Sequence, residues 1–464
     1  MGVSSLGAGS SILTQDVIDQ LKAADNAKFV APIDAKISAE NKKQMAFETT
    51  QAGVDSVYES LKSVNEYGVF EGRTTSLSKD DVVDVTAAEG SDIQDFTLDV
   101  TQIATKEIVQ SGQFDTKDSK IADGDGTMEL SVGDKTFSID YNASTSLDDL
   151  KDLINDKAGD SVSATIIQVA DGDYRLMLSS AETGTDQAIS ISDSDDGSLV
   201  DQLKPDEDSD DDIDGMTNVQ EGVDAKFKFN GLEITRSSNN VDDLLTGVKI
   251  TLKDVGRTEV NVEQDRARIE DRITNFIDKY NSMMYQLGVD TKSSQDDEER
   301  GVYSSDTTMK NMKSDFMNII PSVGGDAGRL QEFGIEVDRE GRLSLNSKLL
   351  NEKLDENPEN VHSYFIGGTY TQDDGSTIEL KGAFASLENK FADYSKGGKI
   401  LDNYSDSINT RLDSLSAQRE KAVERLDNSY EIMQKKFASY DLMISQYNKT
   451  SDMFIQMMNA DNND

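Results

Sequence analysis

The residues best suited to chemistry lie in one aspartate-rich stretch, DDDIDGMTNVQE, at residues 210–221. Its spacing matches a calcium loop, in which carboxylates at the first, third, fifth and twelfth positions surround one ion. The carboxylates at these positions belong to Asp210, Asp212, Asp214 and Glu221. The flanking segments do not read as EF-hand helices, and Asp-rich surroundings produce partial matches easily. The sequence therefore favours an acidic surface loop and leaves calcium as the one candidate ligand.

Few other residues could catalyse a reaction or bind a cofactor. The chain has no cysteine and a single histidine, His362, so the commonest general base is nearly absent and thiolate chemistry is excluded. His362 follows Asn357 and Pro358, a turn that leads into a helix, and is expected to be structural there. No phosphate loop, zinc motif or dinucleotide fingerprint is present. We predict a non-enzymatic protein without a cofactor.

The chain carries a large negative charge. It has 89 acidic and 46 basic residues, a formal charge of −43. Of these, 36 acidic and 9 basic residues lie between residues 76 and 221. Such a charge repels nucleic acids and anionic membranes, and no apolar run approaches the about 20 residues of a membrane span. We predict no nucleic-acid partner, no membrane insertion and, because no basic residue precedes Lys22, no cleaved signal peptide.

The strongest pattern in the sequence is a heptad series near the C-terminus. Apolar or aromatic residues recur there at alternating steps of three and four, which places them on one face of a helix. With Ser451 as the single exception, they occupy positions 423, 426, 430, 433, 437, 440, 444, 447, 451, 454 and 458. The pattern predicts a coiled-coil helix over residues 401–459, about 90 Å long.

The N-terminal helices show a weaker pattern. The segment TQDVIDQLKAADNA begins at a candidate N-cap, Thr14, and the next helix has Pro32 in its first turn, where the missing N–H is harmless. Val17, Leu21 and Ala24 share one face of the first helix, and the residues predicted to face a partner are Val17, Leu21, Ile33 and Ile37. Because helices occupy both ends of the chain, we expect the termini to pair with each other, weakly and reversibly.

The middle of the chain, residues 76–264, alternates short β-rich runs with Gly, Asn and Asp turns. Two segments share one plan, MELSVGDKTFSIDYNASTSLDDL (128–150) and FKFNGLEITRSSNNVDDL (227–244). Each predicts a strand, a glycine turn, a second strand and a helix that starts near Asp-Asp-Leu. In the first copy, Ser146 and Asp149 are spaced as a capping box. Two related small β-rich units are therefore predicted.

The predicted fold class is α+β multidomain, with terminal helices forming a coiled-coil leg, an α-rich head domain and two nested small β-rich domains. Within the head, a hairpin turns at Asp338–Gly341 and Asn346 caps the next helix. The predicted division is an N-terminal leg helix at 1–40, the head at 41–75 and 265–400, the β domain at 76–111 and 222–264, the inserted β domain at 112–221 and the C-terminal leg at 401–464.

Four segments of the chain carry a family resemblance. SSLGAGSSILTQDVIDQLKAADNAKFVAPIDAKI resembles the N-terminal region of the bacterial flagellar filament-capping protein family, hook-associated protein 2. Residues 224–265 resemble the β domain of that family. FGIEVDREGRLSLNSKLLNEKLDENPENVHSYF, followed by the heptad helix, resembles its C-terminal region. Residues 124–191 resemble the flagellin-type insertion motif. The resemblance covers nearly the whole chain, in order.

The resemblance implies a non-enzymatic cap at the distal end of the flagellar filament, needed for filament elongation and motility. Such caps are homo-oligomeric rings, most often of five copies, that promote folding and insertion of exported flagellin. The resemblance also implies an extracellular position at the filament tip and export through the flagellar type III apparatus. The implied partners are further copies of the chain, flagellin, hook–filament junction proteins and an export chaperone that binds the C-terminal helix.

We expect the legs to contact these partners through apolar side chains, some of them methionines that tolerate repacking. The predicted interface residues are Val17, Leu21, Ile33, Ile37, Leu426, Tyr430, Met433, Phe437, Tyr440, Ile444, Tyr447, Phe454 and Met458. Three alternatives stay open: a surface adhesin whose acidic β units contact glycans, another flagellar axial protein such as a hook–filament junction protein, and a carboxylate-based hydrolase, which the absence of tryptophan disfavours.

Overall fold

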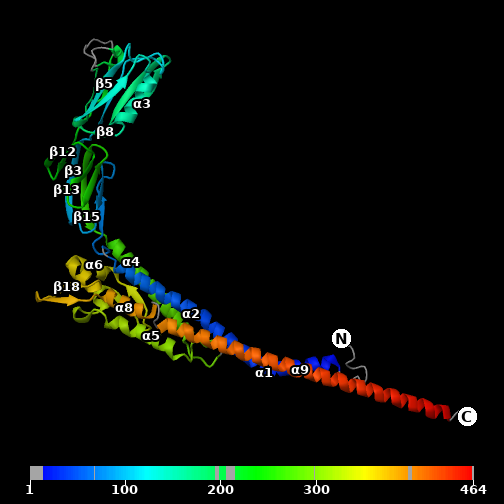
Figure 1. Cartoon of the computed structure of the whole chain (residues 1–464). Helices are drawn as coiled ribbons and strands as arrows, with labels where there is room; N and C mark the ends of the chain where they lie inside the picture. The colour runs from blue at the N-terminus through cyan, green and yellow to red at the C-terminus, as the bar shows by residue number, and fades with distance from the viewer. Residues whose placement is uncertain are drawn as a thin grey trace. The chain divides into compact units, whose positions relative to one another are not determined.

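The computed structural model of the chain describes residues 14–66, 68–193, 198–204, 215–296, 298–395 and 400–461. The chain forms two compact units. One combines Met1–Glu66 with Ile269–Asp464, and the other is Tyr67–Arg268. The first, here called the helical unit, contains both ends of the chain, and the second, here called the β unit, lies between them in sequence (Figure 1).

The helical unit is built from long helices at its two ends and shorter ones between them (Figure 1). Two short antiparallel hairpins, β16–β17 (Ile335–Val337 and Leu343–Leu345) and β18–β19 (Gly368–Thr371 and Thr377–Leu380), complete it. The helices are α1 (Gln15–Phe29), α2 (Ala31–Val64), α4 (Arg266–Asp290), α5 (Thr307–Ile319), α6 (Ser347–Glu356), α7 (Pro358–Phe365), α8 (Ala383–Ser395) and α9 (Ile400–Asp461).

Aromatic side chains fill the core of the helical unit. Phe316 of α5 stacks on Phe391 of α8 with ring centroids 4.3 Å apart, and Phe276 of α4 meets Phe384 edge-on at 5.5 Å. α2 packs against both α8 and α9. This packing confirms the prediction that the helices at the two ends of the chain lie side by side, as Figure 1 shows for α2 and α9.

The β unit contains two hydrophobic cores. The first lies between a five-stranded antiparallel sheet, ordered β1-β15-β3-β11-β12, and a three-stranded one, β13-β14-β2. The strands are β1 (Arg73–Leu77), β2 (Val83–Ala87), β3 (Gln94–Gln102), β11 (Ala225–Phe229), β12 (Leu232–Arg236), β13 (Asn240–Leu245), β14 (Val248–Leu252) and β15 (Gly256–Gln264). The segments before and after the middle of the unit thus build one core together.

The second core comes from the stretch between β3 and β11. A four-stranded sheet, β10-β4-β8-β7, and a three-stranded one, β6-β5-β9, enclose it together with helix α3. The elements are β4 (Lys106–Gln110), β5 (Gly126–Val132), β6 (Lys135–Tyr141), α3 (Leu147–Ala158), β7 (Val162–Ala170), β8 (Asp173–Thr183), β9 (Ile189–Asp193) and β10 (Thr217–Gln220). The α+β class with small antiparallel sheets in the middle of the chain is therefore confirmed.

The two copies of the predicted repeat differ in their last element. In the first copy α3 forms, and Ser146 and Asp149 make the predicted capping box. In the second copy the predicted helix is wrong, because Asn240–Leu245 is strand β13. Leu245 is paired with Val248 across a two-residue turn, so the chain reverses before a helical turn could be completed.

Helix ends elsewhere follow the local signals of the sequence. Asn346 caps α6 by accepting a hydrogen bond from the Leu349 N–H at 3.1 Å, and Pro32 lies in the first turn of α2. Thr14 occupies the N-cap of α1, but its side chain makes no capping hydrogen bond. α2 continues without a break to Val64. One helix therefore includes both the half-buried Ile33 and Ile37 and the fully buried residues that follow them.

Candidate partner-binding face of the terminal helices

A small hydrophobic core joins α1 to α9. It consists of Ile18 and Val30 on the N-terminal side and of Leu426 and Tyr430 on α9, all buried. Partly buried side chains of α9, including Phe437, pack against this core. With only four buried residues, the contact is much smaller than the core of the unit, as expected for a pair of helices that separates easily.

Polar contacts fix the register of α1 on α9. The Lys22 Nζ lies 2.7 Å from the Asp427 Oδ1, and the Tyr430 hydroxyl donates a hydrogen bond of 2.7 Å to the Asp25 Oδ2. This hydrogen bond to a carboxylate raises the pKa of Tyr430. Because these partners differ at each turn of the helix, sliding α1 by one turn would break both contacts.

α2 continues the polar contacts along α9. The Arg419 Nε lies 2.5 Å from the Asp34 Oδ1, and the Arg411 Nε lies 3.4 Å from the Oε1 of the buried Glu40. In both pairs the acid is on α2 and the arginine on α9. The N-terminal helices and α9 are therefore matched in charge along their shared length, which opposes other registers.

The residues of α1 predicted to contact a partner lie beside the buried one. Val17 and Leu21 are 38% and 45% exposed, whereas Ile18, which was not predicted, is 1% exposed. On a helix Val17 lies about 100° and Leu21 about 60° around the axis from Ile18, so Ile18 is the α1 helix residue in the core shared with α9, and Val17 and Leu21 stay available to another partner. The charge complementarity of Lys22 and Asp25 with α9 was the signal that could have identified the side of α1 that packs on α9. Ile33 and Ile37 of α2 are half-buried.

The predicted residues of α9 divide into two groups. Leu426 and Tyr430 are buried, and Met433, Phe437 and Ile444 are half-buried. The remaining predicted residues are exposed, with Tyr447 at 75% and Phe454 at 65%. Together with one methionine that was not predicted, they form what is called here the C-terminal apolar face: Tyr440, Met443, Tyr447, Phe454 and Met458.

The C-terminal apolar face lies on a single side of α9. Its five residues are separated by three, four, seven and four positions, spacings that return to nearly the same helix angle. The last turns of α9 extend past α1 (Figure 1). Burying a large apolar side chain stabilises a complex by about 1.5–3 kcal/mol, so this face can bind another apolar helix or groove without any covalent chemistry.

The predicted calcium ligands are only partly described. Asp210, Asp212 and Asp214 lie outside the described residues. Glu221 is described, and its backbone oxygen accepts a hydrogen bond of 2.7 Å from the Thr105 Oγ1. Within the described ranges, no three His, Cys, Asp or Glu residues are grouped so that they could hold a metal ion. Calcium binding by this loop stays a prediction.

His362 lies on a short helix, as predicted. The helix is α7, which Asn357 caps by accepting a hydrogen bond of 3.0 Å from the Asn360 N–H. The His362 backbone oxygen accepts from the Ile366 N–H at 2.8 Å. These contacts give His362 an ordinary place in the last turn of a helix.

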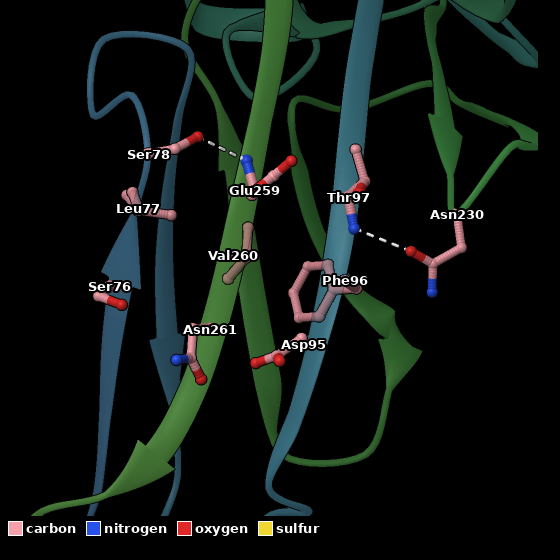
Figure 2. A pocket seen from close by; sticks show the side chains of 10 residues that line it. All are labelled: Ser76, Leu77, Ser78, Asp95, Phe96, Thr97, Asn230, Glu259, Val260 and Asn261. Atoms are coloured by element: carbon pink, nitrogen blue, oxygen red, sulfur yellow. Dashed lines mark hydrogen bonds between the residues drawn. The ribbon is translucent and has the colours of Figure 1, made fainter.

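The β unit has a polar hollow on its five-stranded sheet (Figure 2). Asp95 and Thr97 of β3 and Glu259 and Asn261 of β15 line it, together with the buried Phe96 and Val260 between them. At one side, the Asn230 Oδ1 accepts a hydrogen bond of 2.8 Å from the Thr97 N–H (Figure 2). Such a surface offers hydrogen-bond donors and acceptors to a polar ligand.

Family models match most of the chain. The model for the flagellar hook-associated protein 2 C-terminus matches residues 222–449, and the model for the N-terminus of the same protein matches residues 10–107. The chain belongs to the flagellar hook-associated protein 2 family. A third model, the flagellin hook IN motif, matches residues 127–182. Membership confirms the predicted resemblance, and it confirms the prediction of a structural, non-enzymatic flagellar protein.

Relatives in several bacteria are similar to this chain, two of them along nearly their whole length. The A-type flagellar hook-associated protein 2 of Pseudomonas aeruginosa is 24% identical, over 98% of this chain and 97% of that protein. The Salmonella typhimurium protein is 24% identical over 99% of both chains. The Campylobacter jejuni protein is 27% identical over 82% of this chain, which covers 66% of that longer relative.

A solved structure shares the fold. The D1-D2-D3 domains of the flagellar cap protein FliD from Escherichia coli align with a TM-score of 0.59 at 23% identity, over 78% of this chain and 99% of that one. In the described part of this chain, no helix has the length and apolar character needed to cross a membrane.

Proposed function

We propose that this chain caps the distal end of the bacterial flagellar filament. In this role it forms a homo-oligomeric ring, of five copies as is most often described for the family, and it promotes the folding and insertion of flagellin that arrives beneath it. It is exported through the flagellar type III apparatus and is located at the filament tip. Elongation of the filament, and so motility, depend on it.

The observation that carries this proposal is the C-terminal apolar face of α9. An isolated chain in water leaves this face exposed, with Tyr447 and Phe454 among its most exposed apolar residues. Large exposed apolar surfaces on a helix are typical of binding sites for other proteins. Membership in a flagellar family supports partners of the flagellar assembly, and we infer that these are flagellin and the hook–filament junction proteins at the filament end, and an export chaperone before secretion.

The chain's architecture fits a division of labour. We infer that the terminal helices form a coiled-coil leg and that the remaining helices form a head domain. The β unit then consists of two nested domains, the inner one carrying the flagellin-type motif. The contact between α1 and α9 in the leg is small, and polar pairs set its register, so the two helices can separate and bind other helices. The head has a larger core and keeps its fold when they do.

The proposal is tested in the source bacterium by replacing the gene. A strain with Tyr447→Ser and Phe454→Ser is expected to form short or no filaments and to release unassembled flagellin into the medium. The matched control, Lys449→Ser and Asp452→Ser, changes two exposed polar residues of the same helix and is expected to leave filament length unchanged. Normal filaments in the first strain would exclude the C-terminal apolar face from the function.

Oligomeric state separates the cap from a junction protein. Light scattering of the full chain is expected to show one discrete small oligomer that persists on dilution. A monomer at every accessible concentration would contradict a self-standing ring and favour a hook–filament junction protein.

A second candidate function, surface adhesion, is favoured by the polar hollow on the five-stranded sheet. The hollow presents several hydrogen-bonding side chains to a polar ligand, among them Asp95, Thr97, Glu259 and Asn261. A glycan array probed with the full chain tests this function. Binding that Asp95→Ala abolishes would support adhesion through this hollow, and the absence of any binding glycan would exclude it.

A further inference from the structure

The two hydrophobic cores of the β unit meet at a polar joint. The chain leaves the first core after Ala104 to build the second, and it returns to the first core before Ala225. The turn after β8 is hydrogen-bonded to both of these crossing segments. The joint is defined by the segments 102–107, 183–185, 218–224 and 237–239. Its contacts are hydrogen bonds and close backbone approaches.

The two crossing segments are bonded to each other. The Thr105 N–H donates to the Val223 oxygen at 3.0 Å, and the Val223 N–H donates to the Thr105 Oγ1 at 3.2 Å. The Gln102 Nε2 donates to the Asp224 oxygen at 2.7 Å. On the first core, the Asn239 side chain closes two hydrogen bonds with the backbone of Ala104, at 2.7 and 2.8 Å. The crossing is thus a paired ribbon rather than two loose linkers.

The turn after β8 ties the second core back onto the first. The Gly184 N–H donates to the Thr105 oxygen at 3.0 Å. The Thr185 N–H donates to the Asp224 Oδ1 at 2.8 Å, and the Thr183 Oγ1 donates to the Ser237 oxygen at 2.6 Å. This third attachment lies beside the ribbon, so a rotation about the ribbon would break it.

A buried carboxylate holds the return segment. Glu107 is buried, and its two carboxylate oxygens accept from the Gly222 N–H at 2.6 Å and from the Asn218 Nδ2 at 2.7 Å. Its own N–H donates to the Ser180 Oγ at 3.1 Å. A buried carboxylate with hydrogen-bond donors to both oxygens is costly to displace, because opening the joint would leave those groups without partners unless water entered.

Two glycines let the backbones approach. A Cβ placed on Gly184 would lie 2.7 Å from the Ser237 Cβ, and one on Gly222 would lie 2.7 Å from the Gly184 oxygen. Real Cβ atoms are essentially never found so close to other heavy atoms. The three segments are therefore packed at backbone contact, which leaves no space for a hinge motion.

We propose that this joint is a rigid clasp that fixes the orientation of the second core on the first. The β unit then presents its inner domain at one set angle, whatever that domain contacts. The clasp depends on three attachments at once, on the glycine contacts and on Glu107. This inference does not depend on the proposed function.

Electron paramagnetic resonance on the full chain tests the clasp. The chain has no cysteine, so Glu129→Cys on β5 and Lys249→Cys on β14, both exposed, place one spin label on each core. The unaltered joint is expected to give one narrow distance distribution. Gly184→Ala and Gly222→Ala are expected to broaden or shift it.

Two matched controls isolate the contacts. Gly172 has a positive φ like Gly184, but a Cβ there would meet nothing within 4 Å; Gly124, like Gly222, has no positive φ, and its Cβ would meet only the Ser198 Cβ at 3.8 Å. Gly172→Ala and Gly124→Ala are expected to leave the distribution narrow. A broad distribution with the unaltered joint would overturn the clasp, and so would unchanged distributions in both joint variants.

Discussion

Tyrosine hydroxyls inside the helical unit act as hydrogen-bond donors. Tyr303 donates to the Lys43 oxygen at 3.2 Å, and Tyr404 donates to the Asp306 Oδ2 at 2.7 Å. Burial is the main cause that raises the pKa of both residues, and the nearby Asp306 carboxylate adds to it. Each hydroxyl therefore keeps its proton to higher pH in the folded protein than in the unfolded chain.

At alkaline pH we expect the helical unit to lose stability. An unfolded tyrosine ionises near pH 10, whereas these folded ones hold their protons to higher pH. Their contribution to the free energy of unfolding is thus fully present below about pH 10 and falls as pH rises further. Chemical unfolding followed by circular dichroism between about pH 8 and 11 measures the slope. Tyr404→Phe is expected to reduce this dependence of the free energy of unfolding on pH. The control, Tyr447→Phe at an exposed position, is expected to leave it unchanged. Equal slopes in the two variants would show that Tyr404 does not cause the loss of stability.

Among the secondary-structure elements, the bounds were predicted best where an apolar repeat continued over many residues. The heptad series predicted a helix over residues 401–459, and α9 is Ile400–Asp461. The 15-residue α1 has apolar residues on more than one side, so its partner decides which side is buried, and Ile18 was missed. The helix predicted after residue 240 failed for a similar reason, because β14 was available as a strand partner.

The contact between α1 and α9 predicts different effects for substitutions at the neighbouring residues Ile18 and Val17. Ile18→Ala removes the main α1 side chain of a four-residue core and is expected to cost about 2 kcal/mol or more. Amide hydrogens of α1 should then exchange faster, whereas those near Leu61, which is fully buried in α2, should not change. Val17→Ala is the control. Exchange that is equally fast in both variants would mean that Ile18 does not hold α1 in place.

At the scale of the whole molecule, the helical unit and the β unit have separate cores. The chain joins them only near residues 66–67 and 268–269. We expect calorimetry to resolve two unfolding transitions. Phe316 in the helical unit and Leu130 in the β unit are both fully buried. Phe316→Ala should cost about 3–5 kcal/mol and Leu130→Ala about 2–5 kcal/mol, and each should lower one transition only. A single transition that both variants shift would show that the units unfold together.

The pairing of Thr105 with Val223 has a consequence for how proteins of this kind change length. Where the two ends of an inserted segment are hydrogen-bonded to each other, a whole domain can be gained, lost or exchanged there without disturbing the sheet that carries it. Removing residues 106–222 would leave a gap that a short turn can close. Such a site lets the inserted domain change in length and sequence while the sheet that carries it keeps its strands and its core.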